Sequence, residues 1–140
     1  MMRIILAAML LFCGVCEASD WVSVWKSADG TVESFVDAAN IKVEGGIRTA
    51  WLKRVPKPHT EKELDDNANK WVDYQLSSGS FDCVEMVIRE ESNAVYYDDG
   101  TVQRYENPFL ESLGVPEPWM PLPDDPLAKA LMQFICAYKQ

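Results

Sequence analysis

The stretch that decides the fold is residues 94–105, which read AVYYDDGTVQRY. Two runs rich in β-branched and aromatic residues, Ala94–Tyr97 and Val102–Tyr105, flank the tetrapeptide Asp98-Asp99-Gly100-Thr101. Asp and Gly accept the positive φ of a tight turn, and the flanking residue types suit a pleated strand. The stretch therefore predicts a β-hairpin and, with it, an antiparallel sheet.

A second hairpin is predicted near the start of the chain. Trp21–Val36 alternates in polarity on both sides of a turn at Ala28-Asp29-Gly30-Thr31. In the first arm, a period of two places one set of side chains on one face and the other set opposite. These sets are Trp21, Ser23 and Trp25 on one side, and Val22 and Val24 on the other.

Three further strands are predicted between the hairpins, at Ile47–Val55, Trp71–Leu76 and Phe81–Arg89. Pro56 ends the first of them, because proline cannot donate to a ladder. The polar stretch Thr60–Lys70 has no apolar stripe and is read as a solvated loop or a short helix. The sequence thus predicts a sheet of about six strands.

A helix is predicted at the C-terminus, after a proline-rich segment. Asn107–Pro126 holds six prolines, which disfavour regular structure and favour an extended, docked segment. Asp124 or Asp125 can then cap a helix that has Pro126 in its first turn. Apolar residues recur at helical spacing, namely Leu127, Ala130, Leu131, Phe134 and Ile135. The fold class predicted is α+β, with this helix packed on one antiparallel sheet.

The first eighteen residues resemble a secretory signal. Arg3 precedes a charge-free run from Ile4 to Cys16 that is too short to span a bilayer, and small residues precede a cut between Ala18 and Ser19. The expected mature domain is residues 19–140, and the alternative is that residues 1–18 form a buried element of the fold. Phe12 and Val15 stand before Cys13 and Cys16, where a lipidation site needs small residues, so a lipid anchor is not expected.

Two cysteines remain after that cut, Cys83 and Cys136. In an oxidising compartment such a pair predicts a disulfide, which here would hold the helix on the Phe81–Arg89 strand. Two buried free thiols are the alternative. The sequence has one histidine and no CxxC motif, so no metal site is predicted.

The formal net charge is −9. Because nucleic acids and anionic lipids attract basic surfaces, neither is expected as a partner. No apolar run after the signal approaches membrane length, so no integral membrane span is expected. The simpler interpretation of the acidity is that it keeps an exported domain soluble.

No catalytic residue is predicted. His59, the only histidine, lies between Pro58 and Thr60 in a polar stretch without a plausible nucleophile. The neighbouring acids Asp65-Asp66, Asp98-Asp99 and Asp124-Asp125 each have a local explanation in a loop, a turn or a helix start. Asp65–Lys70 begins like a calcium loop but has Lys70 where glycine is required. No cofactor is expected.

Aromatic residues are the remaining feature. The chain has five tryptophans, Trp21, Trp25, Trp51, Trp71 and Trp119, and five tyrosines. Tryptophan and tyrosine are favoured anchors of protein interfaces, although each can equally be a core residue. Tyr96 and Tyr97 are adjacent on a predicted strand, so they face opposite ways. Partner-binding residues cannot be named from this pattern.

The order of these features resembles the bacterial surface-adhesin protein E family. The matching residues are Trp21, Val36-Asp37 with Ile41, Trp51-Leu52-Lys53, Asp82-Cys83, Tyr97-Asp98-Asp99-Gly100, Pro118-Trp119 with Pro121 and Pro123, and Cys136. The resemblance implies a helix pinned to the sheet by Cys83–Cys136, a cell-envelope location, and binding of host matrix or plasma proteins by a dimer. No ligand-contact residue is implied.

The sequence therefore favours a non-enzymatic binding module of the cell envelope or a secreted one, with an unidentified protein partner and a homodimer left open. It is expected to be exported, to the periplasm or the outer-membrane surface. Two alternatives are an inhibitor of a cationic enzyme such as a lysozyme, and a structural accessory subunit of an envelope assembly.

Overall fold

The computed structural model of the chain describes residues 18–62, 69–105, 113–114 and 118–139. Its strands are β1 (Trp21–Lys26), β2 (Val32–Asp37), β3 (Lys42–Glu44), β4 (Ile47–Pro56), β5 (Val72–Asp82), β6 (Val87–Tyr97), β7 (Val102–Tyr105) and β8 (Met120–Pro121). The helices are η1 (Ala38–Asn40), a single 3-10 turn, and α2 (Pro126–Ala137).

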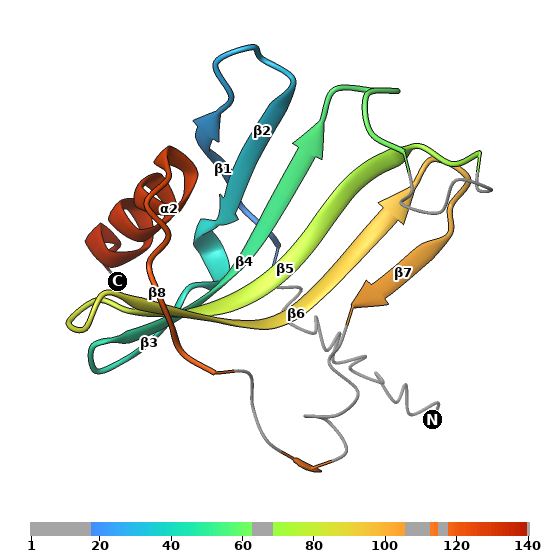
Figure 1. Ribbon diagram of the computed structural model, residues 1–140. Helices are drawn as coiled ribbons and strands as arrows, with labels where there is room; N and C mark the ends of the chain where they lie inside the picture. The colour runs from blue at the N-terminus through green and yellow to red at the C-terminus, as the bar shows by residue number, and fades with distance from the viewer. Residues whose placement is uncertain (1–17, 63–68, 106–112, 115–117, 140) are drawn as a thin grey trace, which may run out of the picture.

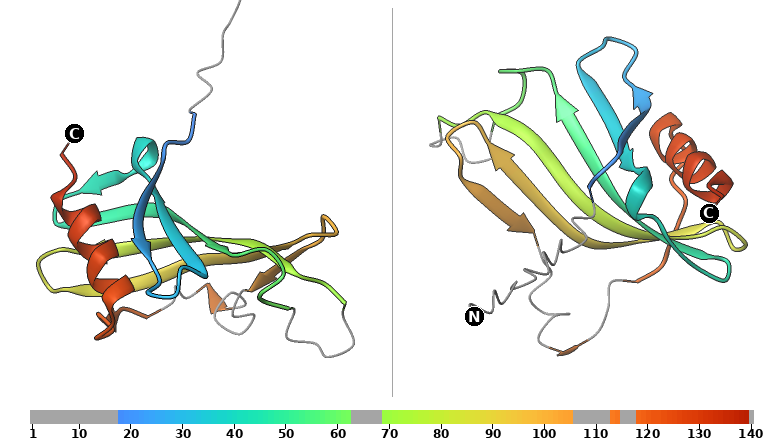
Figure 2. Two further views of the ribbon diagram at one scale, coloured as in Figure 1. Left: turned by 90° about the horizontal axis from the view of Figure 1, so that it is seen from above. Right: turned by 180° about the vertical axis from the view of Figure 1, so that it is seen from behind.

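All eight strands belong to one antiparallel sheet (Figure 1). Six strands follow one another in the order β1-β2-β4-β5-β6-β7, while β3 pairs with β4 and β8 pairs with β6. The sheet twists strongly, so β1 and β2 run at an angle to β5 and β6 (Figure 2). Helix α2 lies on one side of the sheet. The predicted fold is confirmed, and the two short strands raise the count from about six to eight.

The core lies between α2 and the sheet. It is formed by Val36, Ile41, Ala50, Phe81, Met132 and Ile135, all at most 6% exposed. Met132 and Ile135 are the buried residues of α2, and Leu131 and Phe134 pack partly against the same cluster. The apolar stripe predicted for the helix therefore faces the sheet, and its burial supplies the main force that holds the two layers together.

Both ends of α2 are fixed by side chains. At the N-terminus, Asp125 caps the helix by accepting a hydrogen bond of 2.8 Å from the Ala128 backbone N–H, and Pro126 occupies the first turn. At the C-terminus, Arg48 on β4 donates to the carbonyl oxygens of Ile135, at 2.8 Å, and Tyr138. A cation there satisfies carbonyls that have no helical partner and complements the helix dipole.

The segment predicted as one strand over Phe81–Arg89 contains a turn, at residues 83–86, between two longer strands. β5 ends at Asp82 and β6 begins at Val87. The Asp82 carboxylate accepts hydrogen bonds of 3.0 Å from the backbone N–H groups of Val84 and Glu85, and Met86 takes a φ of 55°. This Asx-type turn contains neither Gly nor Pro, so the residues showed no break in the strand pattern.

The alternation predicted for the first strand is also broken, by a β-bulge between Ser23 and Trp25. Trp21 pairs with Asp37 and Ser23 with Phe35, whereas Trp25 pairs with Ser34. Because paired residues share a face, Trp25 moves to the face of Ser34, which is the one that α2 covers. The three residues therefore do not share a face.

Other expected segments are only partly within the described chain. Residues 1–17, 63–68, 106–112 and 115–117 lie outside it, and with them most of the expected signal, most of the Thr60–Lys70 loop and the calcium-like motif. Within the proline-rich segment, β8 pairs with β6 and Leu122 packs against the core. That part is extended and docked, as predicted.

Candidate functional site on the outer face of the sheet

The face of the sheet that turns away from α2, here called the outer face, carries a row of aromatic rings. Leu52 packs on the core, so its neighbours Trp51 and Lys53 point outward. The Lys53 ammonium lies over two rings, 4.7 Å from the centre of Tyr74 and 5.7 Å from that of Trp21. Tyr74 stacks on Tyr96 with ring centres 4.5 Å apart.

This row, from Trp21 through Lys53 and Tyr74 to Tyr96, joins β1, β4, β5 and β6 into one surface. Each ring holds the next in place, because the cation–π contacts and the stacking restrict rotamers that would otherwise be free. Burial of Tyr74, with smaller contributions from the Tyr96 and Asp73 groups, raises the pKa of its hydroxyl. Trp51, two residues before Lys53, is 44% exposed. The outer face thus presents ordered, partly solvated aromatic area.

A second cation–π pair occupies the other end of the outer face. The Arg89 guanidinium lies 4.7 Å from the Trp119 ring, and one of its nitrogens is 3.3 Å from Glu91. Glu91 also accepts a 2.6 Å hydrogen bond from Ser80, which lies 3.2 Å from the Thr49 hydroxyl. A polar network thus lies between the two aromatic groups, with Ser80 only 2% exposed.

The electrostatics of the outer face differ from those of the whole chain. The chain carries a net charge of −9, yet both cation–π pairs set a positive side chain over a ring. Among the described residues, Lys53 takes part in no salt bridge, and its ammonium lies against ring faces instead. A cation and exposed rings held together suit polar and apolar contacts with one partner.

His59 lies at a different place, at one tip of the sheet. It is largely exposed and has a φ of 59°, with its ring centre 5.4 Å from that of Trp71 and Nε2 3.9 Å from Asp98. Lys62 covers the other part of this site, 4.7 Å from the Trp71 ring. The interactions of the His59 side chain in the described part of the chain are thus with Trp71 and Asp98.

Two of the three pairs of adjacent acidic residues lie in the described chain, and their carboxylates stabilise local structure. The Asp98 carboxylate accepts from the Trp71 backbone N–H, and Asp99 accepts from Thr101 within the predicted turn. In the third pair, Asp124 forms an ion pair with Lys129 next to the helix cap. Asp65-Asp66 lies outside the described residues.

The predicted disulfide is present. Cys83, the first residue of the β5–β6 turn, is bonded to Cys136 in the last turn of α2 with a Cα–Cα distance of 5.8 Å. The bond closes a sequence separation of 53 residues and ties the helix to the end of a hairpin. The predicted strand boundaries placed Cys83 inside a strand, whereas the bond attaches at the turn.

Ala18 and Ser19, which flank the predicted cleavage point, are exposed and precede β1. The next residue, Asp20, donates its backbone N–H to the Asp37 carboxylate at 2.8 Å, and the Asn40 side chain donates to the same group at 2.7 Å. Burial raises the pKa of Asp37, but these hydrogen bonds outweigh it and the pKa is lowered. These hydrogen bonds attach the chain just before β1 to the end of β2.

Arg54 and Glu61 form an ion pair in which each side chain is about one-third exposed, with Arg54 Nη1 2.8 Å from Glu61. Hydrogen bonding from Arg54 lowers the pKa of the Glu61 carboxyl. The contact fastens the start of the polar stretch to β4 and takes no part in the outer face.

Neither a metal centre nor a spanning helix is found in the described residues. No cluster of three or more His, Cys, Asp or Glu side chains there could hold a metal ion. No helix among residues 18–62, 69–105, 113–114 and 118–139 is long and apolar enough to cross a membrane.

Sequence reasoning did not identify the outer face. The signal was present, because Trp51 and Lys53 alternate with Leu52, and Tyr74 and Tyr96 are aromatic residues on neighbouring strands. The register that sets them opposite each other depends on a bulge between Val72 and Tyr74, which the sequence does not reveal. Tyr97, in contrast, is 4% exposed and points to the other face.

A single twisted antiparallel sheet with one disulfide-bonded C-terminal helix defines the chain as a small α+β domain. The family model of surface-adhesin protein E matches residues 21–137, and the chain belongs to this family. Protein E of Haemophilus influenzae, in crystal form II, is similar in structure with a TM-score of 0.57. The match covers 90% of this chain and 98% of that chain at 12% identity, so it bears on the fold alone. No curated relative matches the sequence.

Proposed function

We propose that the chain is an exported, non-enzymatic binding module that contacts a protein partner through its outer face. The observation that carries the proposal is the row of Trp21, Lys53, Tyr74 and Tyr96, extended by the exposed Trp51. Rings fixed before binding lose little conformational entropy on contact, so such a row can anchor an interface. Membership of an adhesin family supports a protein as the partner.

Binding of host matrix or plasma proteins is the specific form of this proposal. Residues 19–140 are immobilised, and laminin, vitronectin and an envelope extract are passed over them. A partner that binds is then titrated against Trp51→Ser, which we expect to weaken the affinity by tenfold or more, as for a central aromatic anchor. Tyr105→Ser is the matched control, since Tyr105 is 39% exposed on β7 but pairs with Asn93 on the other face. An equal loss in both variants contradicts binding through the outer face.

The acidity of the chain supports a second candidate, an inhibitor of a cationic enzyme such as a lysozyme. A net charge of −9 attracts a cationic protein. The outer face suits this role less well, because Lys53 projects there and takes part in no salt bridge among the described residues. Retention of a cationic hydrolase, with loss of its activity and no effect of Trp51→Ser, would favour the inhibitor over the adhesin. A structural accessory subunit would instead co-purify with a stable envelope assembly.

A homodimer is a further part of the proposal. Sedimentation of residues 19–140 at micromolar concentration measures the mass directly. If the dimer uses the outer face, Trp51→Ser yields the monomer, and Tyr105→Ser does not. A monomer in the unaltered protein would remove the dimer from the proposal and leave the binding role intact.

A further inference from the structure

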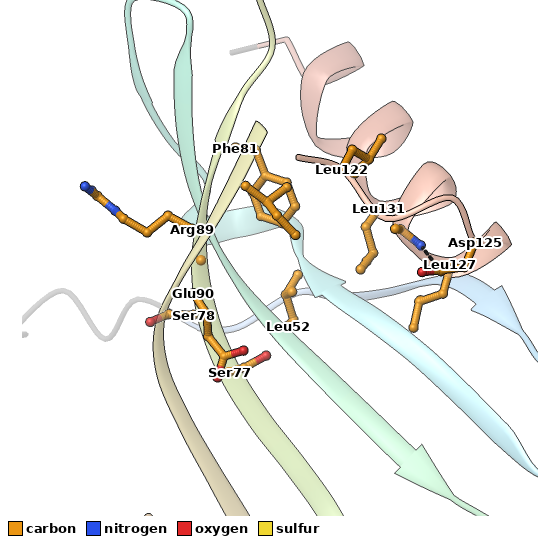
Figure 3. A pocket seen from close by; sticks show the side chains of 13 residues that line it. Leu52, Ser77, Ser78, Phe81, Arg89, Glu90, Leu122, Asp125, Leu127 and Leu131 are labelled. Atoms are coloured by element: carbon orange, nitrogen blue, oxygen red, sulfur yellow. Dashed lines mark hydrogen bonds between the residues drawn. The ribbon is translucent and has the colours of Figure 1, made fainter. Parts of the chain in front are cut away.

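A cavity of about 170 Å³ lies between α2 and the sheet, on the face opposite to the aromatic row (Figure 3). Its apolar lining comes from Leu52, Phe81, Ile88, Leu122, Leu127 and Leu131. In Figure 3, Leu52, Phe81, Leu127 and Leu131 converge from the sheet and the helix on one space. Its lining from the helix comes from the N-terminal half of α2, the part of the helix farthest from the disulfide.

Small residues create the hollow. Gly79 contributes no side chain to the floor, and a Cβ atom there would lie 3.2 Å from the Arg89 carbonyl oxygen. This close approach accompanies a register shift between Ser78 and Gly79, where β6 holds one residue more than β5. Ala128 faces the same space from the first turn of α2. Larger side chains at these positions would fill it.

The charged groups at the cavity are acidic. Glu90 pairs with Gly79 on the helix side of the sheet and has no ion-pair partner among the described residues. One oxygen of the Asp125 carboxylate caps α2 through Ala128, which leaves the other available. Arg89 also lines the cavity, but its side chain points away to Trp119 on the outer face (Figure 3).

We propose that this cavity receives one apolar side chain of a polypeptide partner that carries a basic residue next to it. The volume fits a single side chain, since a cavity of about 150 Å³ lined by apolar residues holds one benzene molecule. The acidic rim and the net charge of −9 select a positive neighbour. They disfavour a fatty acid, whose carboxylate would meet Glu90 and Asp125, and whose chain exceeds the space.

This site is separate from the outer face, so its test does not depend on the proposed function. Blocked tetrapeptides Gly-Leu-Lys-Gly, Gly-Leu-Glu-Gly and Gly-Ser-Lys-Gly are titrated into residues 19–140, and the methyl NMR signals of Leu127 and Leu131 are followed. We expect the first peptide to shift these signals with a dissociation constant of roughly millimolar size, as one buried side chain allows. The other two should bind at least about tenfold more weakly, because each lacks one of the two recognised groups.

Two variants test the site itself. Ala128→Leu fills the cavity and should weaken the first peptide about tenfold or more. Glu90→Gln should weaken it about two- to fivefold, the effect of an exposed ion pair, while Glu44→Gln on β3 leaves it unchanged. If Ala128→Leu does not fold, Ser77→Leu fills the same space from β5.

Three results would overturn the proposal. The first is no shift of the methyl signals up to about 10 mM peptide. The second is equal binding of the Lys and Glu peptides, since the acidic rim would then have no role. The third is binding of hexylamine without binding of the peptide, which would make the cavity a site for small amines.

Discussion

Removal of the disulfide tests how α2 is held on the sheet. The bond joins Cys83 to Cys136 across a sequence separation of 53 residues, a loop that contains β6, β7, β8 and most of α2. On the chain-entropy account, closing a loop of this length restricts the unfolded chain and stabilises the fold by about 4 kcal/mol. The double variant Cys83→Ser/Cys136→Ser should therefore lose roughly that amount of unfolding free energy, a large part of the total for a small domain.

The helix should nevertheless remain docked in this variant. Met132 and Ile135 stay buried, and Arg48 still donates to the carbonyl oxygens of Ile135 and Tyr138. Urea unfolding followed by tryptophan fluorescence gives the free energy, and far-ultraviolet circular dichroism in the absence of urea gives the helix content. We expect an earlier midpoint with an unchanged spectrum of the folded state.

Ile135→Ala in the oxidised protein is the matched comparison. It removes a fully buried side chain but keeps the closed loop, and should cost about 2–5 kcal/mol with a loosened helix. A loss below about 1 kcal/mol in the double Ser variant would refute the loop-entropy reasoning. Detachment of the helix in that variant would instead show that the covalent bond, and not the packing of Met132 and Ile135, holds it.

Three further predictions concern single groups. Arg48→Met removes the cation at the end of α2 and should destabilise the fold by about 1–3 kcal/mol, measured by urea unfolding. Relative to the unaltered protein, the rate of backbone hydrogen exchange should increase most in α2. The pKa of Asp37 is lowered in the fold, so its contribution is complete above the ordinary carboxyl pKa of 3.8 and is lost as the pH falls through the folded value. As the pH is lowered from neutral to acid, the urea midpoint of Asp37→Asn should accordingly fall less than that of the unaltered protein. Export should remove residues 1–18, and an intact mass from a periplasmic fraction that retains them, or carries acyl chains, would contradict cleavage before Ser19.

Local chemistry made a large part of the fold predictable. The hairpins at the two edges of the sheet were predicted because Gly30 and Gly100 mark their turns. These glycines take positive φ values of 71° and 83°, a conformation that glycine accepts without strain. The helix was found because an Asp cap and Pro126 mark its start and its apolar residues keep a helical period. These signals act within a few residues of chain, so the sequence carries them directly.

What could not be predicted depends on register and on contacts between distant residues. The β5–β6 turn is held by the Asp82 side chain and has no glycine, and the bulge before Trp25 leaves no mark in the sequence. The aromatic outer face and the cavity both arise from such shifts, since Tyr74 and Gly79 each follow a break in pairing. A shift of one residue exchanges the two faces of a strand, so alternation alone cannot assign them.

The contact of α2 with β1 sets the order in which the domain can be completed. Helix α2, the last element described, packs on β1, the first strand. Val24 of β1 packs against the same core as Ile135 of α2. A nascent chain leaves the ribosome N-terminus first, so the core stays open until α2 has emerged. Folding of this domain must therefore follow synthesis of α2, because no shorter N-terminal fragment contains the helix that closes the core.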